Sequence, residues 1–216
     1  MTFAFVQLNP AIQSPRAEGM RSLHPRRRDA IFKQTALRLR SSLSLVTPLR
    51  TNNPMQPILK LNLTTGKTEE FKIPSQWEKD FLGGASLAAR ILYDYLTPDL
   101  DPLSADAPLL FLTGPMTGTS GPTTGRFVIC GKSPATGLWA ESNIGGFWGP
   151  ELRAAGYDGL WITGKASELS YVWLNESRLE IKSAAHLSGM NTYHTQDKVR
   201  EEVGVKSARV CVIGQA

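Results

Sequence analysis

The placement of glycine is the feature that most constrains how this chain can fold. Two glycine-dense segments, 114–125 and 145–149, lie about twenty residues apart and bracket two short β-type runs. Because glycine weakens regular structure and allows sharp turns, long helices and long strands are excluded from this part of the chain. The sequence must therefore fold into short elements joined by tight loops.

Hydrophobic patterning around these loops predicts an α+β domain of short strands with a few helices. A capping box from Ser75 to Glu78 predicts a helix start, and Pro98 and Gly156 are stop signals for later helices. The strand–helix alternation of a doubly wound sheet is absent. Strands are expected at 58–63, 68–73, 109–113, 127–130, 138–140, 159–163, 171–175, 179–182 and 208–213, and helices at 85–96, 150–155 and 193–203.

The net charge of +5 is concentrated at one end of the chain. Residues 1–54 hold nine basic and two acidic side chains, whereas residues 55–216 hold 15 basic and 17 acidic ones. Because the folded-looking pattern starts at Met55, we expect 1–54 to be a disordered or non-native extension and 55–216 to be the domain. An organellar transit peptide and a basic nucleic-acid-binding arm around Arg26–Arg28 remain open alternatives for the extension.

The cysteines and the hydropathy exclude several classes of protein. Cys130 and Cys211 lie 81 positions apart among apolar β-type residues, which indicates buried thiols and excludes a Cys-x-x-Cys motif. The three histidines show no metal-ligand spacing, and no catalytic constellation can be placed. No apolar run reaches 18 residues, so we expect no membrane-spanning segment. We also expect a cytoplasmic protein with neither a membrane nor a nucleic-acid partner.

The first glycine-rich segment has the composition of an anion-binding loop. It contains four glycines whose backbone amides can converge, threonine and serine hydroxyls, and Arg126 at its exit. Such a combination suits a phosphate group. The alternative is an ordered turn between two strands.

The second glycine-dense segment, taken with its neighbours as Glu141–Glu151, also has features of an anion-binding loop. Gly145 and Gly146 precede an expected helix, whose free N–H groups would favour an anion. The alternative is a strand-to-helix connection in which Asn143 and the glycines only supply the turn. Together, the two segments are suited to face one large, multiply phosphorylated ligand.

The order of these motifs resembles the N-terminal domain of the aldehyde:ferredoxin oxidoreductase family of tungsten enzymes. The resemblance covers about residues 57–214. Its most specific motifs are Thr113–Thr119 with Gly125–Phe127, Lys132–Pro134 with Thr136–Gly137, and Asn143–Leu152. Ala155–Gly159 and Gly164–Ala166 complete the match.

The resemblance implies a cofactor and the residues that bind it. In this family two pterins hold a tungsten (or molybdenum) ion over a saddle of two antiparallel β-sheets, and Mg²⁺ links the pterin phosphates. Arg126 resembles the arginine between a pterin and an iron–sulfur cluster. Asn143 resembles the residue whose backbone carbonyl binds the Mg²⁺, and Gly145 and Gly146 resemble the pterin-phosphate contact. Ala85–Ser86 departs from the Arg-Gly that relatives often show.

The implied function is the oxidation of an aldehyde to a carboxylic acid, with electrons passing through a [4Fe-4S] cluster to ferredoxin. A homodimer is one assembly that the resemblance suggests. The family places its cluster ligands and substrate pocket beyond the point where this chain ends, so we expect a fragment without catalytic residues that is inactive alone. The alternative is a non-catalytic pterin- or phosphate-binding module that pairs with a separately encoded catalytic chain.

Overall fold

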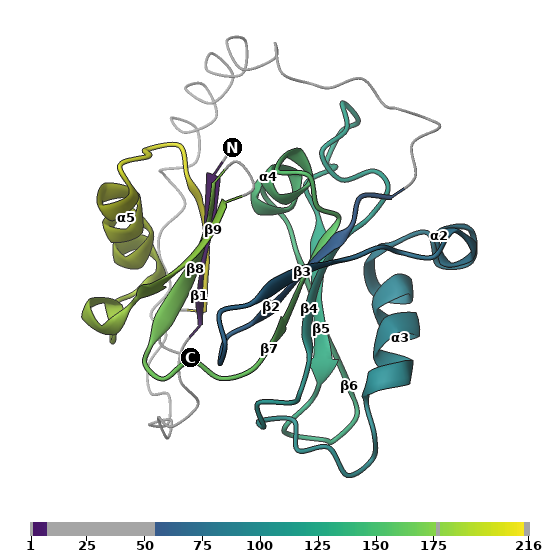
Figure 1. Ribbon diagram of the computed structural model, residues 1–216. Coiled ribbons are helices and arrows are strands. Elements are labelled where there is room, and N and C mark those ends of the chain that lie inside the picture. The colour runs from purple at the N-terminus through teal and green to yellow at the C-terminus, as the bar shows by residue number, and fades with distance from the viewer. Residues whose placement is uncertain (1, 8–54, 176–177, 214–216) are drawn as a thin grey trace, which may run out of the picture.

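A computed structural model describes residues 2–7, 55–175 and 178–213, which form two β-sheets and a few short helices (Figure 1). One sheet has six strands in the order β3-β2-β7-β4-β5-β6, and the other has four in the order β10-β1-β8-β9. The expected α+β class is confirmed.

The six-stranded sheet carries the glycine-rich loops at its strand ends. Its neighbouring strands are antiparallel, except that β2 and β7 run parallel. Strand β6 continues to Ile144, beyond the expected 138–140, so Asn143 lies in a strand and not in the loop that follows. The strands are β2 (Ile58–Asn62), β3 (Thr68–Phe71), β4 (Leu109–Thr113), β5 (Phe127–Lys132), β6 (Trp139–Ile144) and β7 (Gly159–Thr163).

The four-stranded sheet contains a strand from the far N-terminus. β1 (Thr2–Gln7) lies between β8 (Ser170–Asn175) and β10 (Arg209–Val212), and β9 (Arg178–Ser183) follows β8. The backbone of residues 2–7 therefore joins a sheet, although these residues belong to the segment that the sequence separates from the domain. The basic cluster Arg26–Arg28 and both alternatives for it lie outside the described residues, and the division at residue 54 stays a prediction.

The helices begin and end close to the expected positions. They are α2 (Ser75–Phe81), α3 (Gly84–Tyr95), α4 (Trp148–Ala154) and α5 (Thr192–Val203), with a one-turn 3₁₀ helix at Ala185–Leu187. None of them is both long and apolar enough to cross a bilayer. The predicted capping box is wrong: the N-cap of α2 is Pro74, so Ser75 is already the first helical residue and its hydroxyl caps nothing. α5 does carry a cap, because the Asn191 side chain accepts a hydrogen bond from the His194 amide.

Both faces of the six-stranded sheet are covered (Figure 1). On one face α3 packs against β4 and β5, burying Leu87 and Ile91 with Leu110 and Leu112. On the other face α4 and the four-stranded sheet pack against it, and Phe111 lies in this second layer. The buried layers fix the strands, so the loops at their ends hold defined positions.

The two cysteines are unpaired thiols with raised pKa values. Burial, and then the negative charge of Glu141, raises the pKa of Cys130 to about 12, and burial raises the pKa of Cys211 to about 11. Since the thiolate is the reactive form, we expect both to react with iodoacetamide at pH 8 about 100-fold more slowly than in the urea-unfolded chain. Equal labelling rates in the two states would contradict the burial of these thiols.

The same shifts predict a stability that falls at alkaline pH. The folded thiols hold their protons at pH values where unfolded cysteine has lost them, so the native state binds more protons above about pH 8.5. The free energy of unfolding should therefore be insensitive to these thiols below that pH and decrease as pH rises towards 11. Urea unfolding of the wild-type chain and a Cys130→Ala/Cys211→Ala variant at pH 8 and pH 10 isolates this contribution from other titrating groups.

Candidate functional site

The two glycine-rich segments found in the sequence touch each other in the structure. A Cβ atom added to Gly125 would collide with the carbonyl oxygen of Gly146, and one on Gly149 would lie 3.2 Å from the Thr117 side chain. Glycine is required here because two stretches of backbone approach more closely than any side chain would allow. The segments form one continuous loop surface.

A third glycine segment joins them at the start of α3. Gly83 has φ +138°, and a Cβ there would lie 3.1 Å from the Thr113 carbonyl oxygen and 3.3 Å from Gly114 Cα. The Ser86 hydroxyl donates to the Gly83 carbonyl at 3.0 Å, which ties this turn to the helix. Gly83 and Gly84 are not among the predicted site residues, although adjacent glycines are a signal for close backbone approach.

The first and third of these segments line a cavity of about 480 Å³, together with residues of β5 and β6. Arg126 and Asn143 both line it, so the structure brings these two predicted site residues together. Gly145 and Gly146 lie outside the lining, on the exposed loop that contacts Gly125. The lining residues are Gly84, Ala85, Leu112, Gly114–Thr117, Pro122–Thr124, Arg126–Val128, Glu141 and Asn143.

Arg126 and Asn143 form a direct hydrogen bond at the cavity. The guanidinium NH1 of Arg126 donates to Asn143 Oδ1 at 2.8 Å, and both residues are exposed. The pairing of β5 with β6 explains this, since Arg126 immediately precedes β5 and Val128 is the register partner of Asn143. Glu141 lies two residues earlier in β6 and lines the same cavity, so the lining carries one cation and one carboxylate.

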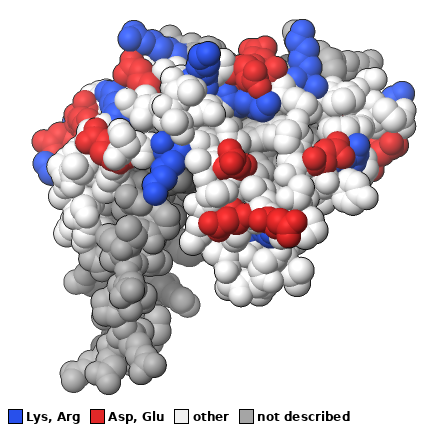
Figure 2. Space-filling model, turned by 60° about the horizontal axis from the view of Figure 1, so that its bottom comes forward, with Lys and Arg blue, Asp and Glu red and all other residues white. Residues whose placement is uncertain are grey.

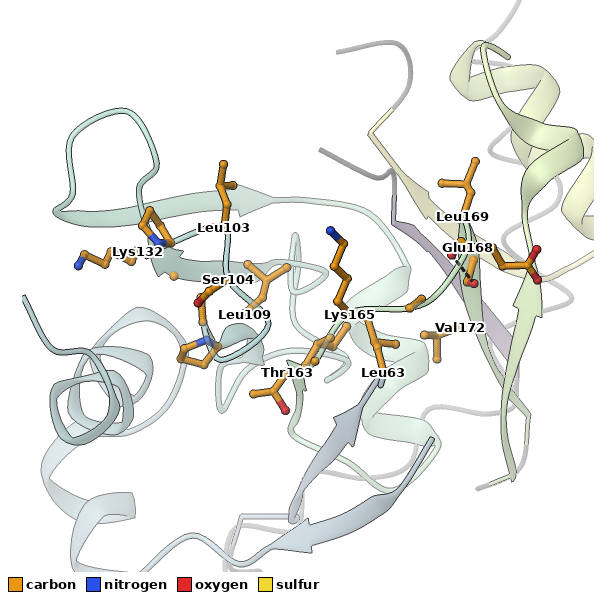
Figure 3. Close-up of a pocket in the computed structure, with 18 residues that line it drawn as sticks. Leu63, Leu103, Ser104, Leu109, Lys132, Thr163, Lys165, Glu168, Leu169 and Val172 are labelled. Atoms are coloured by element: carbon orange, nitrogen blue, oxygen red, sulfur yellow. Dashed lines mark hydrogen bonds between the residues drawn. The ribbon is translucent and has the colours of Figure 1, made fainter. Parts of the chain in front are cut away.

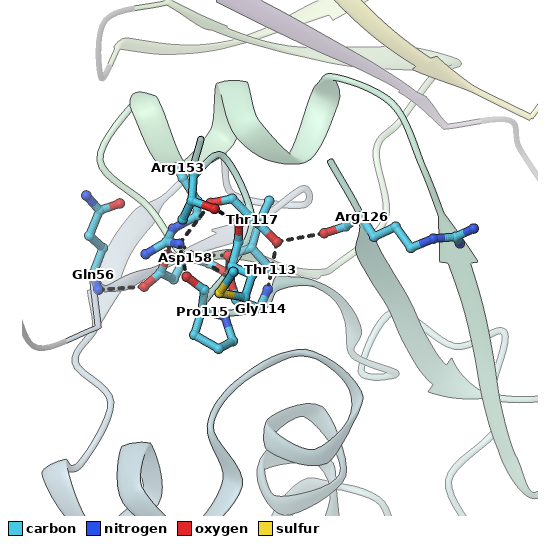
Figure 4. Close-up of polar contacts among 10 residues, drawn as sticks. Gln56, Thr113, Gly114, Pro115, Thr117, Arg126, Arg153 and Asp158 are labelled. Carbon is cyan, nitrogen blue, oxygen red and sulfur yellow. Dashed lines mark hydrogen bonds and ion pairs between the residues drawn. The ribbon is translucent and has the colours of Figure 1, made fainter. Parts of the chain in front are cut away.

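A buried ion pair holds the first glycine-rich loop (Figure 4). Arg153 Nε lies 2.6 Å from Asp158 Oδ1, and Asp158 is only 1% exposed. NH1 of the same guanidinium donates to the carbonyl oxygens of Pro115 and Thr117 at 3.0 and 2.9 Å, and to that of Gly114 at 3.4 Å. Arg153 therefore fixes three backbone carbonyls within the loop that lines the cavity.

Two threonines complete this network. The Thr113 amide and hydroxyl both donate to the Asp158 carbonyl oxygen at 2.9 Å. The Thr117 hydroxyl accepts from the Gly114 amide at 3.0 Å and donates to the Arg126 carbonyl at 2.7 Å. In Figure 4 the backbone of Arg126 joins the network while its side chain points away from it. The loop is thus held by backbone and buried groups, which leaves the Arg126 guanidinium at the cavity.

Sequence reasoning gave neither Arg153 nor Asp158 a role. Asp158 belongs to the Ala155–Gly159 motif, but its burial, which is the informative property, is a tertiary feature. The sequence did offer one signal of this role, because the charged residue Asp158 lies between the aromatic Tyr157 and an expected strand.

A second cavity, of about 180 Å³, lies between the end of β7 and β8 (Figure 3). In Figure 3 the Lys165 side chain extends into the space between Leu109 and Val172. The other lysine in its lining, Lys132, donates from Nζ to the carbonyl oxygens of Thr97, Pro98 and Leu100 at 2.7–3.0 Å, so it holds the segment after α3. This cavity includes none of the four predicted site residues.

The described surface shows mixed charge. In Figure 2 basic and acidic side chains are interspersed, with a short acidic row in the lower part of the view and no continuous basic patch on the described part of that face. Among residues 2–7, 55–175 and 178–213, no group of three or more His, Cys, Asp or Glu side chains could hold a metal ion.

The fold and the cavity together define an α+β domain in which glycine-rich loops line one ligand-sized site that carries an arginine and a carboxylate. Comparison with known sequences identifies the family of this domain: the family described as "Aldehyde ferredoxin oxidoreductase, N-terminal domain" matches residues 58–216. The chain belongs to this family and corresponds to its N-terminal domain, which confirms the family expected from the motifs.

Individual relatives agree with this assignment. Tungsten-containing aldehyde ferredoxin oxidoreductases from Pyrococcus furiosus and Pyrococcus horikoshii are 37% and 38% identical over 158 and 159 residues, covering 73% and 74% of this chain. In each case the match spans 26% of the relative, so the chain corresponds to about a quarter of their length. Among solved structures, the active site complex BamBC of benzoyl coenzyme A reductase is similar, with a TM-score of 0.69, 34% identity and coverage of 71% of this chain and 24% of that one.

Proposed function

We propose that this chain is the pterin-binding domain of a tungsten enzyme that oxidises aldehydes to carboxylic acids with ferredoxin as the electron acceptor. The observation that carries the proposal is the 480 Å³ cavity lined by the Gly84 turn and the 114–124 loop, with the Arg126–Asn143 pair at its lining. The tungsten-containing relatives, of which this domain matches a quarter, support the cofactor and the reaction.

The residues present fit an anionic pterin cofactor. Arg126 has a permanent positive charge and donors in addition to the one that binds Asn143, so it would bind a phosphate or a pterin edge. A Cβ added at Gly145 or Gly146 would meet nothing within 4 Å, so this exposed backbone is open to a phosphate group. The backbone carbonyl of Asn143 is a hard oxygen donor of the type that Mg²⁺ takes.

When bound, the tungsten pterin would supply the two-electron redox chemistry. The domain's own residues bind and orient it: Arg126 balances negative charge, and the network from Arg153 keeps the lining loop in place before the ligand arrives. We assign the [4Fe-4S] cluster, the aldehyde pocket and the ferredoxin contact to the remainder of such an enzyme. A cytoplasmic location and a homodimer are further parts of the proposal.

Replacing Arg126 with alanine should weaken the binding of neopterin monophosphate by about 10- to 100-fold, because a charge-assisted hydrogen bond is lost. Titration of the purified full chain, followed by pterin fluorescence, measures the affinity directly, and inorganic phosphate serves as a competitor. Arg126→Lys should be intermediate, since it keeps the charge and loses the planar fork of donors.

Arg178→Ala is the matched control, because Arg178 is a highly exposed arginine of β9 whose ion pair with Glu180 lies far along the chain from the cavity. It should bind neopterin monophosphate as the wild-type chain does. If Arg126→Ala and Arg178→Ala bind equally well, the assignment of the cavity as the pterin site is wrong.

A second candidate function is a non-catalytic module that assembles with a separate catalytic chain. It is favoured by relatives described as parts of assemblies: the BamBC complex, and the "Aliphatic sulfonate oxidoreductase, WOR-like subunit" of Pyrococcus furiosus, which is 36% identical over 157 residues. Both candidates predict pterin binding. The reading frame downstream of the Ala216 codon separates them, since a frame continuing into cysteine motifs supports one long enzyme and a stop beside a complementary gene supports assembly.

A further inference from the structure

The cavity of about 180 Å³ between the end of β7 and β8 is separate from the proposed pterin site. Of the residues that the structure describes, none lines both this cavity and the 480 Å³ cavity. Its lining extends along the sequence from Leu63 to Val172, so every lining residue lies inside the family match to residues 58–216. The walls of this cavity are therefore built by the family domain itself.

The floor of the cavity is apolar. Leu63, Ile162 and Val172 are buried and belong to the core between the two sheets. Leu109 packs against the same core and also lines the cavity. Since an apolar cavity of about 150 Å³ accommodates a benzene ring, a cavity of 180 Å³ has room for a hydrocarbon group of about six carbons.

Two lysines line the cavity, and they differ in what their ammonium groups bind. Lys132 Nζ donates to three backbone carbonyls, so its charge is already satisfied. Within the described part of the chain, the Lys165 ammonium group has no hydrogen-bond acceptor and no ion-pair partner. The carboxylate of Glu168, which also belongs to the lining, points away from Lys165 in Figure 3. The charge of Lys165 is therefore available to an anion.

The backbone of Lys165 is held in place by the turn between β2 and β3. The Thr64 hydroxyl accepts from the Lys165 amide at 2.9 Å and donates to the Lys165 carbonyl oxygen at 3.3 Å. The preceding residue, Gly164, has φ +79°, and a Cβ there would lie 2.6 Å from Asn62 Oδ1 and 2.7 Å from the Thr64 amide nitrogen. Because this backbone is fixed, the Lys165 side chain starts from a defined position at the cavity, which lowers the entropy cost of binding an anion there.

We propose that this cavity binds a monocarboxylate with an alkyl or aryl group of about six carbons, and that Lys165 is its counter-ion. The hydrocarbon group lies on the apolar floor, and the carboxylate accepts charge-assisted hydrogen bonds from the exposed ammonium group. One cation above an apolar floor suits a singly charged carboxylate better than a phosphate or a dicarboxylate, whose further charge would be buried without a partner. The proposal does not rest on pterin binding, because the two cavities are built from different residues.

Three small molecules test the two features of this cavity separately. Hexanoate should bind the full chain with a dissociation constant of about 0.1–1 mM in calorimetric titration, as expected for a ligand of this size. 1-Hexanol keeps the alkyl chain and lacks the charge, so it should bind about 5- to 10-fold more weakly. Adipate adds a carboxylate at the other end of the chain, so it should bind at least about tenfold more weakly than hexanoate.

Substitution of Lys165 tests its role as the counter-ion. Lys165→Met should bind hexanoate about 5- to 10-fold more weakly and 1-hexanol as the wild type does, because the substitution removes only the charge of a side chain of similar shape. Lys165→Arg keeps the charge and should bind hexanoate within about threefold of the wild type. Lys67→Met is the matched control, since Lys67 is an exposed lysine between β2 and β3 that lies outside the lining.

Acetylation of the wild-type chain locates the ligand without any substitution. Saturating hexanoate should slow the acetylation of Lys165 by an N-hydroxysuccinimide ester at least about threefold, because the bound carboxylate covers the amine and stabilises its protonated form. The acetylation of Lys67 should not change, and mass spectrometry of the digested chain measures both rates.

Three results would overturn the proposal. The first is equal affinity of Lys165→Met and Lys67→Met for hexanoate, and the second is an unchanged acetylation rate at Lys165. The third is binding of 1-hexanol as tight as that of hexanoate, which would show that the cavity is an apolar pocket without a carboxylate site.

Discussion

Replacing Asp158 with alanine should lower the free energy of unfolding by about 3–5 kcal/mol, because it leaves Arg153 partly buried without its counter-ion. Asp158 is 1% exposed and lies 2.6 Å from Arg153 Nε, and its second carboxylate oxygen accepts from the Gln56 amide at 2.8 Å. The substitution removes the ion pair with Arg153 and the hydrogen bond from the Gln56 amide together. Urea denaturation of the full chain, followed by tryptophan fluorescence, measures the change.

Asp106→Ala is the control for this experiment, since Asp106 is an exposed carboxylate of a surface turn. Its effect should stay within about 0.5 kcal/mol. Asp158→Asn should fall between the two, because the amide keeps an acceptor and loses the charge. If Asp158→Ala and Asp106→Ala unfold at the same urea concentration, the ion pair does not stabilise the loop at 113–118.

Replacing Gly125 with alanine should have the second large effect, lowering the free energy of unfolding by about 2–3 kcal/mol, because the new methyl group would collide with the Gly146 carbonyl oxygen. Such a contact can be relieved only by moving backbone, since the clashing atom does not belong to a flexible side chain. The two glycine-rich loops should separate, and binding of neopterin monophosphate should fall with them. Thermal unfolding and the fluorescence titration described above give the two readouts.

Gly145→Ala is the matched control, because a Cβ there meets nothing within 4 Å and its backbone does not have the left-handed conformation that disfavours alanine. Its stability should stay within about 0.5 kcal/mol of the wild type. An equal loss of stability in Gly125→Ala and Gly145→Ala would show that the contact between the loops is not what Gly125 provides.

Much of the fold could be predicted from local patterns. β4 matches the expected 109–113, and α3 and α5 begin within one residue of the expected positions, because apolar periodicity and glycine or proline stop signals are local properties. The capping box failed for a reason of the same kind: Pro74 takes the N-cap position, and the Ser–x–x–Glu spacing alone does not show where the first helical turn begins. The parallel pair β2–β7 could not be predicted, since its strands lie about a hundred residues apart.

The candidate site, like the fold, could be predicted from the sequence only in part. Arg126, Asn143 and the glycine-rich segments were visible as residue types suited to an anion, and their motifs identified the family. Their grouping depends on strand register, because Asn143 meets Arg126 only through the pairing of β6 with β5. Gly83–Gly84, Arg153 and Asp158 were not identified as parts of the site, because burial and close approach are properties of the packed chain.

The sequence by itself therefore determined the family, the α+β class and the residue types at the site, since these follow from composition, spacing and periodicity. Only the tertiary structure decided that three glycine segments meet beside one cavity, that a buried ion pair holds its loop, and that Thr2–Gln7 pairs with both β8 and β10. The physical reason is that hydrogen bonds, burial and strand pairing join residues far apart in the chain, and no local pattern records which distant partner satisfies a given group.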